Sequence, residues 1–207
     1  MDVQEKITDY LQVPITQNHG KYLGLPSLIG KNKKAIFSFI KDKVWLRFQG
    51  WRKKLLSKAG KEVLLKTVVH SIPSYVMSVF LIPLCLCEEL ERMMNSFWWG
   101  KNGRVHDGIK WKSWDKLCHH KVTGGLGFRR LHEFNLAMLG KLGWRLLQEP
   151  HSLVAKVFKA RYYPSSSFLE AKLGSNPSYV WRSVLASQEL LKKGVRWRIG
   201  TGRDVNV

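Results

Sequence analysis

Apolar residues recur at helical spacing along most of the chain. The pattern is clearest in residues 33–48, where it places five apolar side chains on one face of a helix: Ile36, Phe39, Ile40, Val44 and Phe48. Asn32 is a suitable N-cap for this helix, and Gly50 is expected to end it. The same period predicts further helices at 2–12, 57–70, 75–81, 86–99, 114–119, 131–148, 152–163 and 178–193. The sequence therefore predicts a mostly α-helical fold.

Proline residues divide the helical pattern into short segments. Pro73 and Pro83 each interrupt it, which favours a bundle of short helices over one long rod. A few short β-strands are expected outside the helices, at 22–26, 109–111 and 196–200. The pattern therefore predicts a helical bundle at 31–100 and a second helical unit at 101–193. Segments 1–30 and 194–207 flank these two units.

The composition favours a folded protein over a disordered basic tail. Apolar residues make up 44% of the chain and include nine tryptophans, which is enough to form a core. The longest apolar run, around Ile82–Leu86, is too short to cross a bilayer, so no membrane partner is expected. The first ten residues lack the apolar stretch of a signal peptide.

Cysteine usage points to a reducing intracellular compartment. The three cysteines are odd in number and have neither disulfide-framework nor zinc-site spacing: Cys85, Cys87 and Cys118. Cys118 precedes two histidines, but no further ligands follow at suitable spacing, so no metal site is predicted. The nucleus and the mitochondrion both remain compatible with this composition.

Positive charge dominates the chain and is concentrated in blocks. The formal net charge is +20, with 35 Lys and Arg against 15 Asp and Glu. Residues 21–66 carry +11, whereas the apolar segment 67–100 carries −2. The charge returns to +6 in 101–130 and +7 in 131–207. This imbalance predicts a polyanionic partner, which we take to be RNA, an RNA–DNA hybrid or DNA.

The basic block contains the candidate nucleic-acid-binding residues. Its cations can neutralise phosphates, and few acids lie beside them; the predicted contacts are Lys31, Lys33, Lys34, Arg52, Lys53, Lys54, Lys58 and Lys61. Trp45 and Trp51 interleave with these cations and could stack on unpaired bases. The alternative is that both tryptophans lie in the core while the lysines only solvate a surface.

Other motifs do not support catalysis. The glycine-rich run 124–127 lacks the Gly-Lys-Ser/Thr ending of a phosphate-binding loop and is better explained as a turn that brings Phe128 into a core. Glu88, Glu89 and Glu91 are adjacent, but they fall at an expected helix start, where capping explains them. No catalytic residue and no cofactor is predicted.

Several ordered blocks resemble one family, the plant non-long-terminal-repeat (LINE-type) retroelement reverse transcriptases. The blocks are KYLGLPSLIG, WRKKLLSKAGKEVLLKTVVHSIPSYVMSVFLIP, ELERMMNSFWWG and IKWKSWDKLCHHKVTGGLGFRRLHEFNLAMLGKLGWRLL, and the resemblance runs from about residue 20 to the end. It implies a palm-end, primer-grip-like segment at 1–30, a thumb-like bundle at 31–100 and a connector at 101–193. Residues 194–207 resemble the lead-in to a zinc-binding region.

The resemblance does not extend to the catalytic residues. The family's polymerase uses aspartates, including an Asp-Asp pair, to hold Mg²⁺, and this chain has no such pair. It implies RNA-directed DNA polymerase ancestry, a thumb that contacts template–primer nucleic acid, and a missing palm as a possible partner. The expected function is a truncated, catalytically inactive reverse transcriptase. Two alternatives are a non-catalytic interaction or structural protein, and a pseudogene relic that does not fold.

Overall fold

The computed structural model describes residues 10, 20–26, 29–51, 54–100 and 109–196. The predicted helix over 2–12 and the predicted tail strand lie almost entirely outside these residues. Helices dominate the described part of the chain, so the mostly α-helical prediction is confirmed. None of its helices is both long enough and apolar enough to cross a membrane.

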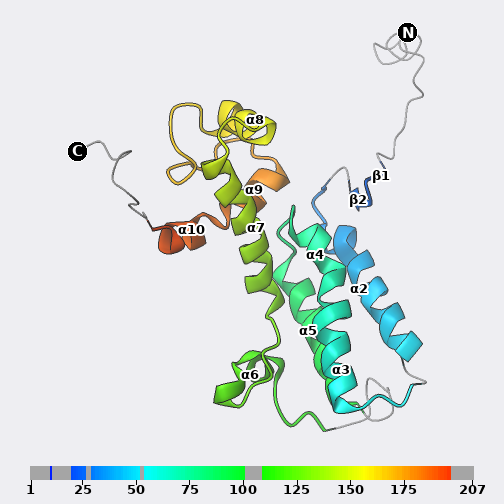
Figure 1. Cartoon of the computed structure of the whole chain (residues 1–207). Coiled ribbons are helices and arrows are strands. Elements are labelled where there is room, and N and C mark those ends of the chain that lie inside the picture. The colour runs from blue at the N-terminus through cyan, green and yellow to red at the C-terminus, as the bar shows by residue number, and fades with distance from the viewer. Residues whose placement is uncertain (1–9, 11–19, 27–28, 52–53, 101–108, 197–207) are drawn as a thin grey trace.

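The helices follow one another with short connections (Figure 1). Their bounds are α2 (Lys33–Trp51), α3 (Lys58–Leu64), the π-helical turn η1 (Leu65–Val69), α4 (Ser71–Met77), α5 (Leu84–Trp99), α6 (Trp114–Cys118), the 3₁₀ turn η2 (Lys121–Thr123), α7 (Leu131–Gln148), α8 (Leu153–Tyr162), α9 (Tyr179–Leu185) and α10 (Gln188–Gly194).

The strand predicted at 22–26 is instead a small hairpin. Strands β1 (Lys21–Tyr22) and β2 (Leu25–Pro26) pair antiparallel across a two-residue turn. Both turn residues have positive φ, 48° at Leu23 and 77° at Gly24. Two-residue hairpin turns need this conformation, and glycine adopts it without strain. Residues 109–111, also predicted to be extended, belong to no strand.

Several predicted helix boundaries are wrong. Helix α2 continues past Gly50 to Trp51, whose ring packs against Phe48 and Phe97 at centroid distances of 6.1 and 5.7 Å. Pro73 lies inside the first turn of α4, where backbone amides have no helical acceptor and proline is tolerated. The single helix predicted at 178–193 is divided into α9 and α10 around Ser187.

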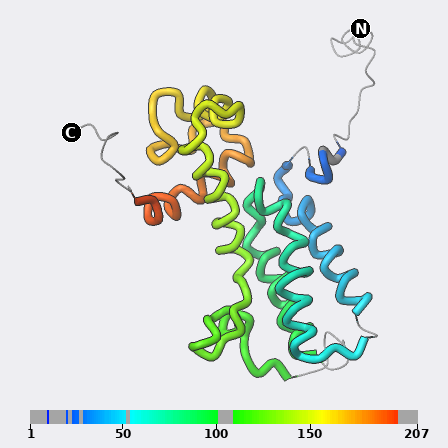
Figure 2. Tube along the Cα trace, viewed as in Figure 1, coloured from blue at the N-terminus to red at the C-terminus, as the bar shows by residue number. Residues whose placement is uncertain are grey.

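The main core lies between α2, α5 and the α3–α4 segment. One face of α2 is fully buried and consists of Phe37, Ile40, Val44 and Phe48. Phe48 stacks on Phe97 of α5 with ring centroids 4.6 Å apart. The same cluster continues past residue 100, through Trp114, Phe128 and Leu131. These helices lie side by side, and α7 runs along them (Figure 2).

A smaller core surrounds Trp181, whose side chain is completely buried. Its ring stacks on Tyr162 and Tyr163 at 4.7 and 5.5 Å, and Phe168 meets it edge-on at 6.0 Å. Helix α7 contacts α4 and α5 of the first cluster and also α8, α9 and α10 around the second. It therefore connects the two cores, and Figure 1 shows it running from the side of α5 up to α8 and α9.

Candidate nucleic-acid interface

The predicted cations that the structure describes do not form one continuous patch. Arg52 and Lys53 lie outside the described residues. Lys31, Lys33 and Lys34 are at the N-terminal end of α2, whereas Lys54, Lys58 and Lys61 follow its C-terminal end. The 19 residues of α2 span about 28 Å at a rise of about 1.5 Å per residue. The two groups are therefore separated by the length of the helix.

Lys58 and Lys61 bind the C-terminal end of α5. The Lys58 Nζ donates to the Trp98 carbonyl at 2.9 Å, and the Lys61 Nζ donates to the Gly100 carbonyl at 2.5 Å. Carbonyls at a helix C-terminus lack intrahelical donors and carry partial negative charge, which a lysine offsets. The Lys58 ammonium also lies 4.8 Å from the Trp98 ring centroid.

Burial makes the charged form of these two lysines less favourable. It lowers the pKa of Lys58, and it is also the main reason why the pKa of Lys61 is lowered, with the Lys58 charge adding to the effect. The Lys61 side chain is only 4% exposed. Because Lys61 is buried and its Nζ already donates to Gly100, the side chain is poorly accessible to a phosphate. We therefore leave Lys61 out of the interface proposed below.

Lys34 is engaged by a carboxylate. Its Nζ lies 2.6 Å from a Glu89 carboxylate oxygen, and Lys41 reaches the other oxygen at 3.0 Å. The hydrogen bond from Lys34, followed by the one from Lys41, lowers the pKa of Glu89 to about 2. These contacts join α2 to α5.

The interpretation of the glutamate cluster as a helix start is wrong. Helix α5 begins at Leu84, and its first turn holds no acid. Glu89 binds the two lysines of α2, while Glu91 accepts from the Leu131 backbone amide at 2.7 Å. Glu91 therefore supplies the first turn of α7 with a cap that its own N-cap residue, Arg130, does not provide.

Lys31 and Lys33 lie beside a cation that the sequence analysis missed. Arg182 of α9 joins them around a hollow of about 480 Å³, whose described lining contains no carboxylate: Ile29, Gly30, Lys31, Lys33, Pro177, Tyr179 and Arg182. The Lys33 ammonium lies 4.9 Å from the Tyr179 ring centroid. We call Lys31, Lys33 and Arg182 the N-terminal cation cluster. About 150 residues separate Arg182 from the lysines, so no local pattern could have revealed it.

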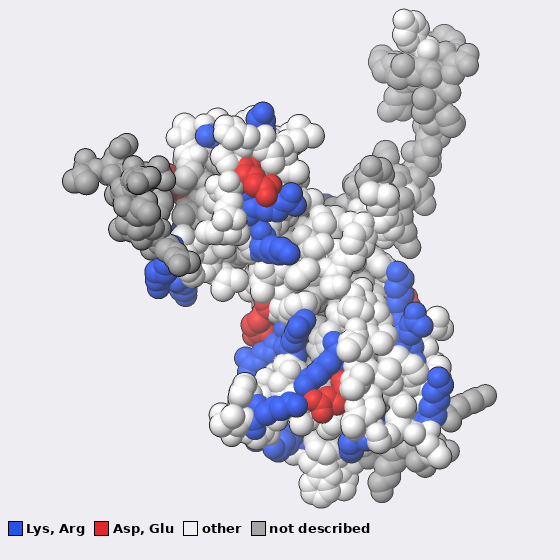
Figure 3. Space-filling model, in the orientation of Figure 1, with Lys and Arg blue, Asp and Glu red and all other residues white. Residues whose placement is uncertain are grey.

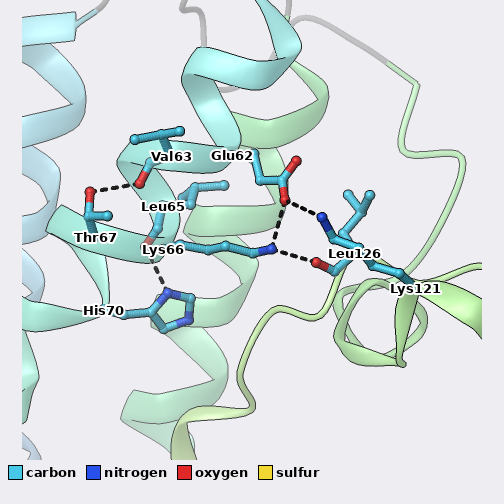
Figure 4. Close-up of polar contacts among 8 residues, drawn as sticks. All are labelled: Glu62, Val63, Leu65, Lys66, Thr67, His70, Lys121 and Leu126. Carbon is cyan, nitrogen blue, oxygen red and sulfur yellow. Dashed lines mark hydrogen bonds and ion pairs between the residues drawn. The ribbon is translucent and has the colours of Figure 1, made fainter.

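A second basic surface surrounds α3 and α6. Lys and Arg side chains gather in the lower part of the face in Figure 3, with few acids among them. The Lys66 Nζ contacts Glu62 and the Leu126 carbonyl, each at 2.7 Å, and Lys121 reaches the same Glu62 at 3.4 Å (Figure 4). These contacts attach the glycine-rich loop to the bundle.

The glycine-rich loop is a packing turn, as the sequence analysis favoured. A Cβ on Gly125 would lie 2.0 Å from the His119 carbonyl oxygen, so only glycine fits there. The turn brings Phe128 into the core, where its ring stacks on Trp114 at 4.8 Å.

The described residues contain no group of three or more His, Cys, Asp or Glu side chains that could hold a metal ion. Burial raises the pKa of the Cys87 and Cys118 thiols to about 12. These two side chains are therefore protonated at neutral pH. Cys87 is buried and Cys118 is partly buried, so both are placed as apolar groups rather than as reactive thiolates.

Comparisons with known proteins give two plant relatives. No protein-family model matches the chain, and no solved structure matches it. It is 34% identical over 186 residues to the "Putative ribonuclease H protein At1g65750" of Arabidopsis thaliana, covering 87% of this chain but 30% of that protein. It is 42% identical over 140 residues to the "Uncharacterized mitochondrial protein AtMg00310" of the same plant, covering 66% of this chain and 89% of that protein. Both relatives are consistent with a plant retroelement origin. The chain belongs to the family of this mitochondrial protein.

Proposed function

We propose that this chain is a fragment of a plant retroelement reverse transcriptase that binds template–primer nucleic acid but lacks the catalytic aspartates. The helical unit at 31–100 acts as the thumb and holds the duplex through phosphate contacts. The observation that carries this proposal is the excess of cations over carboxylates on a folded surface, at +20 for the chain.

The contacts of the carboxylates strengthen this argument. In the described part of the first unit, Glu62, Glu88 and Glu89 each already bind one or two cations of the same chain. The N-terminal cation cluster has no carboxylate in its described lining. A polyanion supplies the missing negative charge, and releasing its counterions adds to the affinity.

The comparisons support the same proposal at a coarser level. The name of one relative, a putative ribonuclease H protein, concerns an enzyme class that acts on nucleic acid, and this chain spans 30% of it. The ordered sequence blocks resemble the region that follows a reverse transcriptase palm. Together they favour a thumb and connector over an unrelated helical bundle.

The test is fluorescence anisotropy with an RNA–DNA hybrid, a DNA duplex and single-stranded RNA across a salt series. We would compare the wild type with the triple variant Lys31→Glu, Lys33→Glu, Arg182→Glu. The matched control reverses three exposed cations of the second unit: Lys156→Glu, Lys159→Glu and Lys172→Glu. Both variants change the net charge by the same amount.

We expect tight binding at low salt, with the logarithm of the binding constant falling linearly as the logarithm of the salt concentration rises. The triple variant should reduce this slope by about 0.9 for each phosphate that the protein no longer neutralises, and the control should change it much less. Equal effects of the two variants would show non-specific attraction by net charge. Weak, salt-independent binding with a cooperative melt would instead favour the interaction or structural protein, and the absence of a cooperative melt would favour the relic.

A further inference from the structure

A second hollow, between α2 and α5, differs chemically from the N-terminal cation cluster. Its volume is about 560 Å³, and its described lining is Lys41, Asp42, Trp45, Arg92, Met93, Ser96 and Lys110. We call it the Trp45 groove. None of the lysines and arginines predicted from the sequence to contact phosphates belongs to its described lining.

The wall of the Trp45 groove is apolar and aromatic. Trp45 is 37% exposed, although its helix buries a complete apolar face elsewhere. The partly buried Met93 of α5 lines the same groove. A flat indole left accessible beside an apolar side chain can stack on another flat ring. The tryptophan that could have been either core or contact is therefore available for contact.

The lining of the groove also includes charged side chains of both signs. Lys41, Arg92 and Lys110 provide three cations for a phosphate. The Lys41 ammonium pairs with Glu89 of α5 at 3.0 Å, which holds it beside the groove. Arg92 belongs to α5 and makes a longer, exposed pair with Glu88 of the same helix at 3.6 Å. Asp42 supplies one carboxylate, which can accept a hydrogen bond from the exocyclic amine of a base.

We infer that the Trp45 groove binds one unpaired nucleobase of a single-stranded segment, stacked on the Trp45 indole. A duplex backbone would use the cations but leave the aromatic wall and the carboxylate without a role. A base pair inside a duplex has both faces covered by its stacked neighbours and cannot reach the indole. The volume lies within the range of about 300–1,000 Å³ typical of small-molecule sites, which suits one nucleotide.

This inference rests on the proposed function and adds a strand preference to it. The N-terminal cation cluster would bind phosphates of any duplex, whereas the Trp45 groove would bind only an unpaired base. The chain would thus favour a nucleic acid that has an unpaired segment over a blunt duplex.

The chain offers a matched control. Trp144 of α7 is also 37% exposed and lines a different, largely apolar hollow between α7 and α10. Trp45→Leu and Trp144→Leu remove the same ring at the same exposure. Trp45→Phe keeps an aromatic face in the groove, so it separates stacking from simple packing.

The probe is an oligonucleotide with a single 2-aminopurine, a base whose fluorescence is quenched on stacking. It would be used as a single strand and as a fully paired duplex, at a saturating concentration of the 207-residue chain. Saturation would be checked by the anisotropy of a dye at the far end. Thermal melts of all variants would be recorded alongside.

We expect the wild-type protein to quench the 2-aminopurine fluorescence of the single strand. In the duplex, where the base is already stacked, the protein should add little quenching. Trp45→Leu should abolish the quenching of the single strand and weaken single-strand affinity about 5- to 150-fold, since stacking on one aromatic residue contributes about 1–3 kcal/mol per base. Trp144→Leu should leave both the quenching and the single-strand affinity at their wild-type values. Trp45→Phe should give values between those of the wild type and Trp45→Leu. If Trp45→Leu also lowers the melting temperature, its loss of binding could come from destabilisation. Trp45→Phe, which keeps an aromatic ring, then separates lost stacking from lost stability.

Three results would contradict the inference, and they are distinguishable. Salt-dependent duplex binding with unaltered single-strand quenching in Trp45→Leu would refute the groove and leave the proposed function standing. If the wild type showed no salt-dependent binding to any of the nucleic acids, the proposed function and the inference would both be refuted. Equal losses in Trp45→Leu and Trp144→Leu would also count against a specific stacking site.

Discussion

Lys61 and Gly100 are joined by a hydrogen bond between positions 39 residues apart, although Lys61 lies in the most basic block of the chain. The ammonium closes the C-terminal end of α5 from inside the bundle, at 4% exposure. A lysine that looks like a phosphate ligand in the sequence is therefore part of the core.

Replacing Lys61 with methionine should destabilise the protein by about 1–3 kcal/mol, because the Gly100 carbonyl would lose its buried donor. The measurement is the free energy of unfolding from chemical denaturation. Lys54→Met, at an exposed position, is the control and should change it by no more than about 0.5 kcal/mol. If Lys61→Met kept its stability but lost nucleic-acid affinity, Lys61 would return to the interface.

Replacing Asn135 with leucine should be severe. Its side chain is completely buried; the Oδ1 accepts from the Ile82 amide at 2.8 Å, and the Nδ2 donates to the Met77 and Phe80 carbonyls at 2.9 and 3.0 Å. Each buried backbone group left without a partner costs about 1–3 kcal/mol, so removing all three bonds should cost at least about 3 kcal/mol.

Asn95→Leu is the control for Asn135→Leu. Asn95 is also buried, but its Oδ1 has no hydrogen-bond partner in the described part of the chain. Chemical denaturation of both variants measures the difference in unfolding free energy. Similar losses in the two would mean that side-chain volume, rather than the bonds to the α4–α5 connection, explains the effect.

The contribution of Glu89 should depend on pH. Its folded-state pKa is lowered from 4.5 to about 2, so the unfolded state binds protons more readily than the folded state between these values. Its stabilising effect is therefore complete above the ordinary pKa of 4.5 and disappears as the pH falls towards about 2. The denaturation midpoints of wild type and Glu89→Gln should differ at pH 7 and converge near pH 2.

Glu88→Gln provides the comparison for this titration. Within the described part of the chain Glu88 pairs with Arg92, at 3.6 Å and with both side chains more than half exposed, so solvent screens the pair. Its difference from wild type should be small across the same pH range. A Glu89→Gln difference that stayed constant down to pH 2 would contradict the proposed role of the two lysines.

Two glycine substitutions should have opposite effects on stability. In Gly125→Ala the new Cβ would lie 2.0 Å from the His119 carbonyl oxygen, a backbone atom that cannot move aside, so the loop and Phe128 must shift. In Gly60→Ala the nearest atom is the Ser57 Oγ at 3.5 Å, an ordinary contact inside α3. Alanine there should stabilise the helix by up to about 1 kcal/mol.

Melting temperatures of the two variants, measured under identical conditions, check this prediction. Gly125→Ala should lower the value and Gly60→Ala should keep or raise it. A stable Gly125→Ala protein with Phe128 still buried would show that the turn between η2 and α7 has another conformation available.

The amino-acid sequence alone determined the helical character of the protein and several of its local details. The predicted helix at 131–148 coincides with α7, and Asn32 and Ser57 cap α2 and α3 through bonds to Ala35 and Gly60. Such features depend on residues three or four positions apart, so periodicity and capping residues are enough to reveal them.

Only the tertiary structure decided which cations are available to a partner. It buried Lys61 under Gly100, paired Lys34 with Glu89, and brought Arg182 beside Lys31 and Lys33. It also left Trp45 accessible between α2 and α5 while Trp181 became the centre of a core. These outcomes depend on contacts between residues tens to about 150 positions apart, which local pattern does not encode.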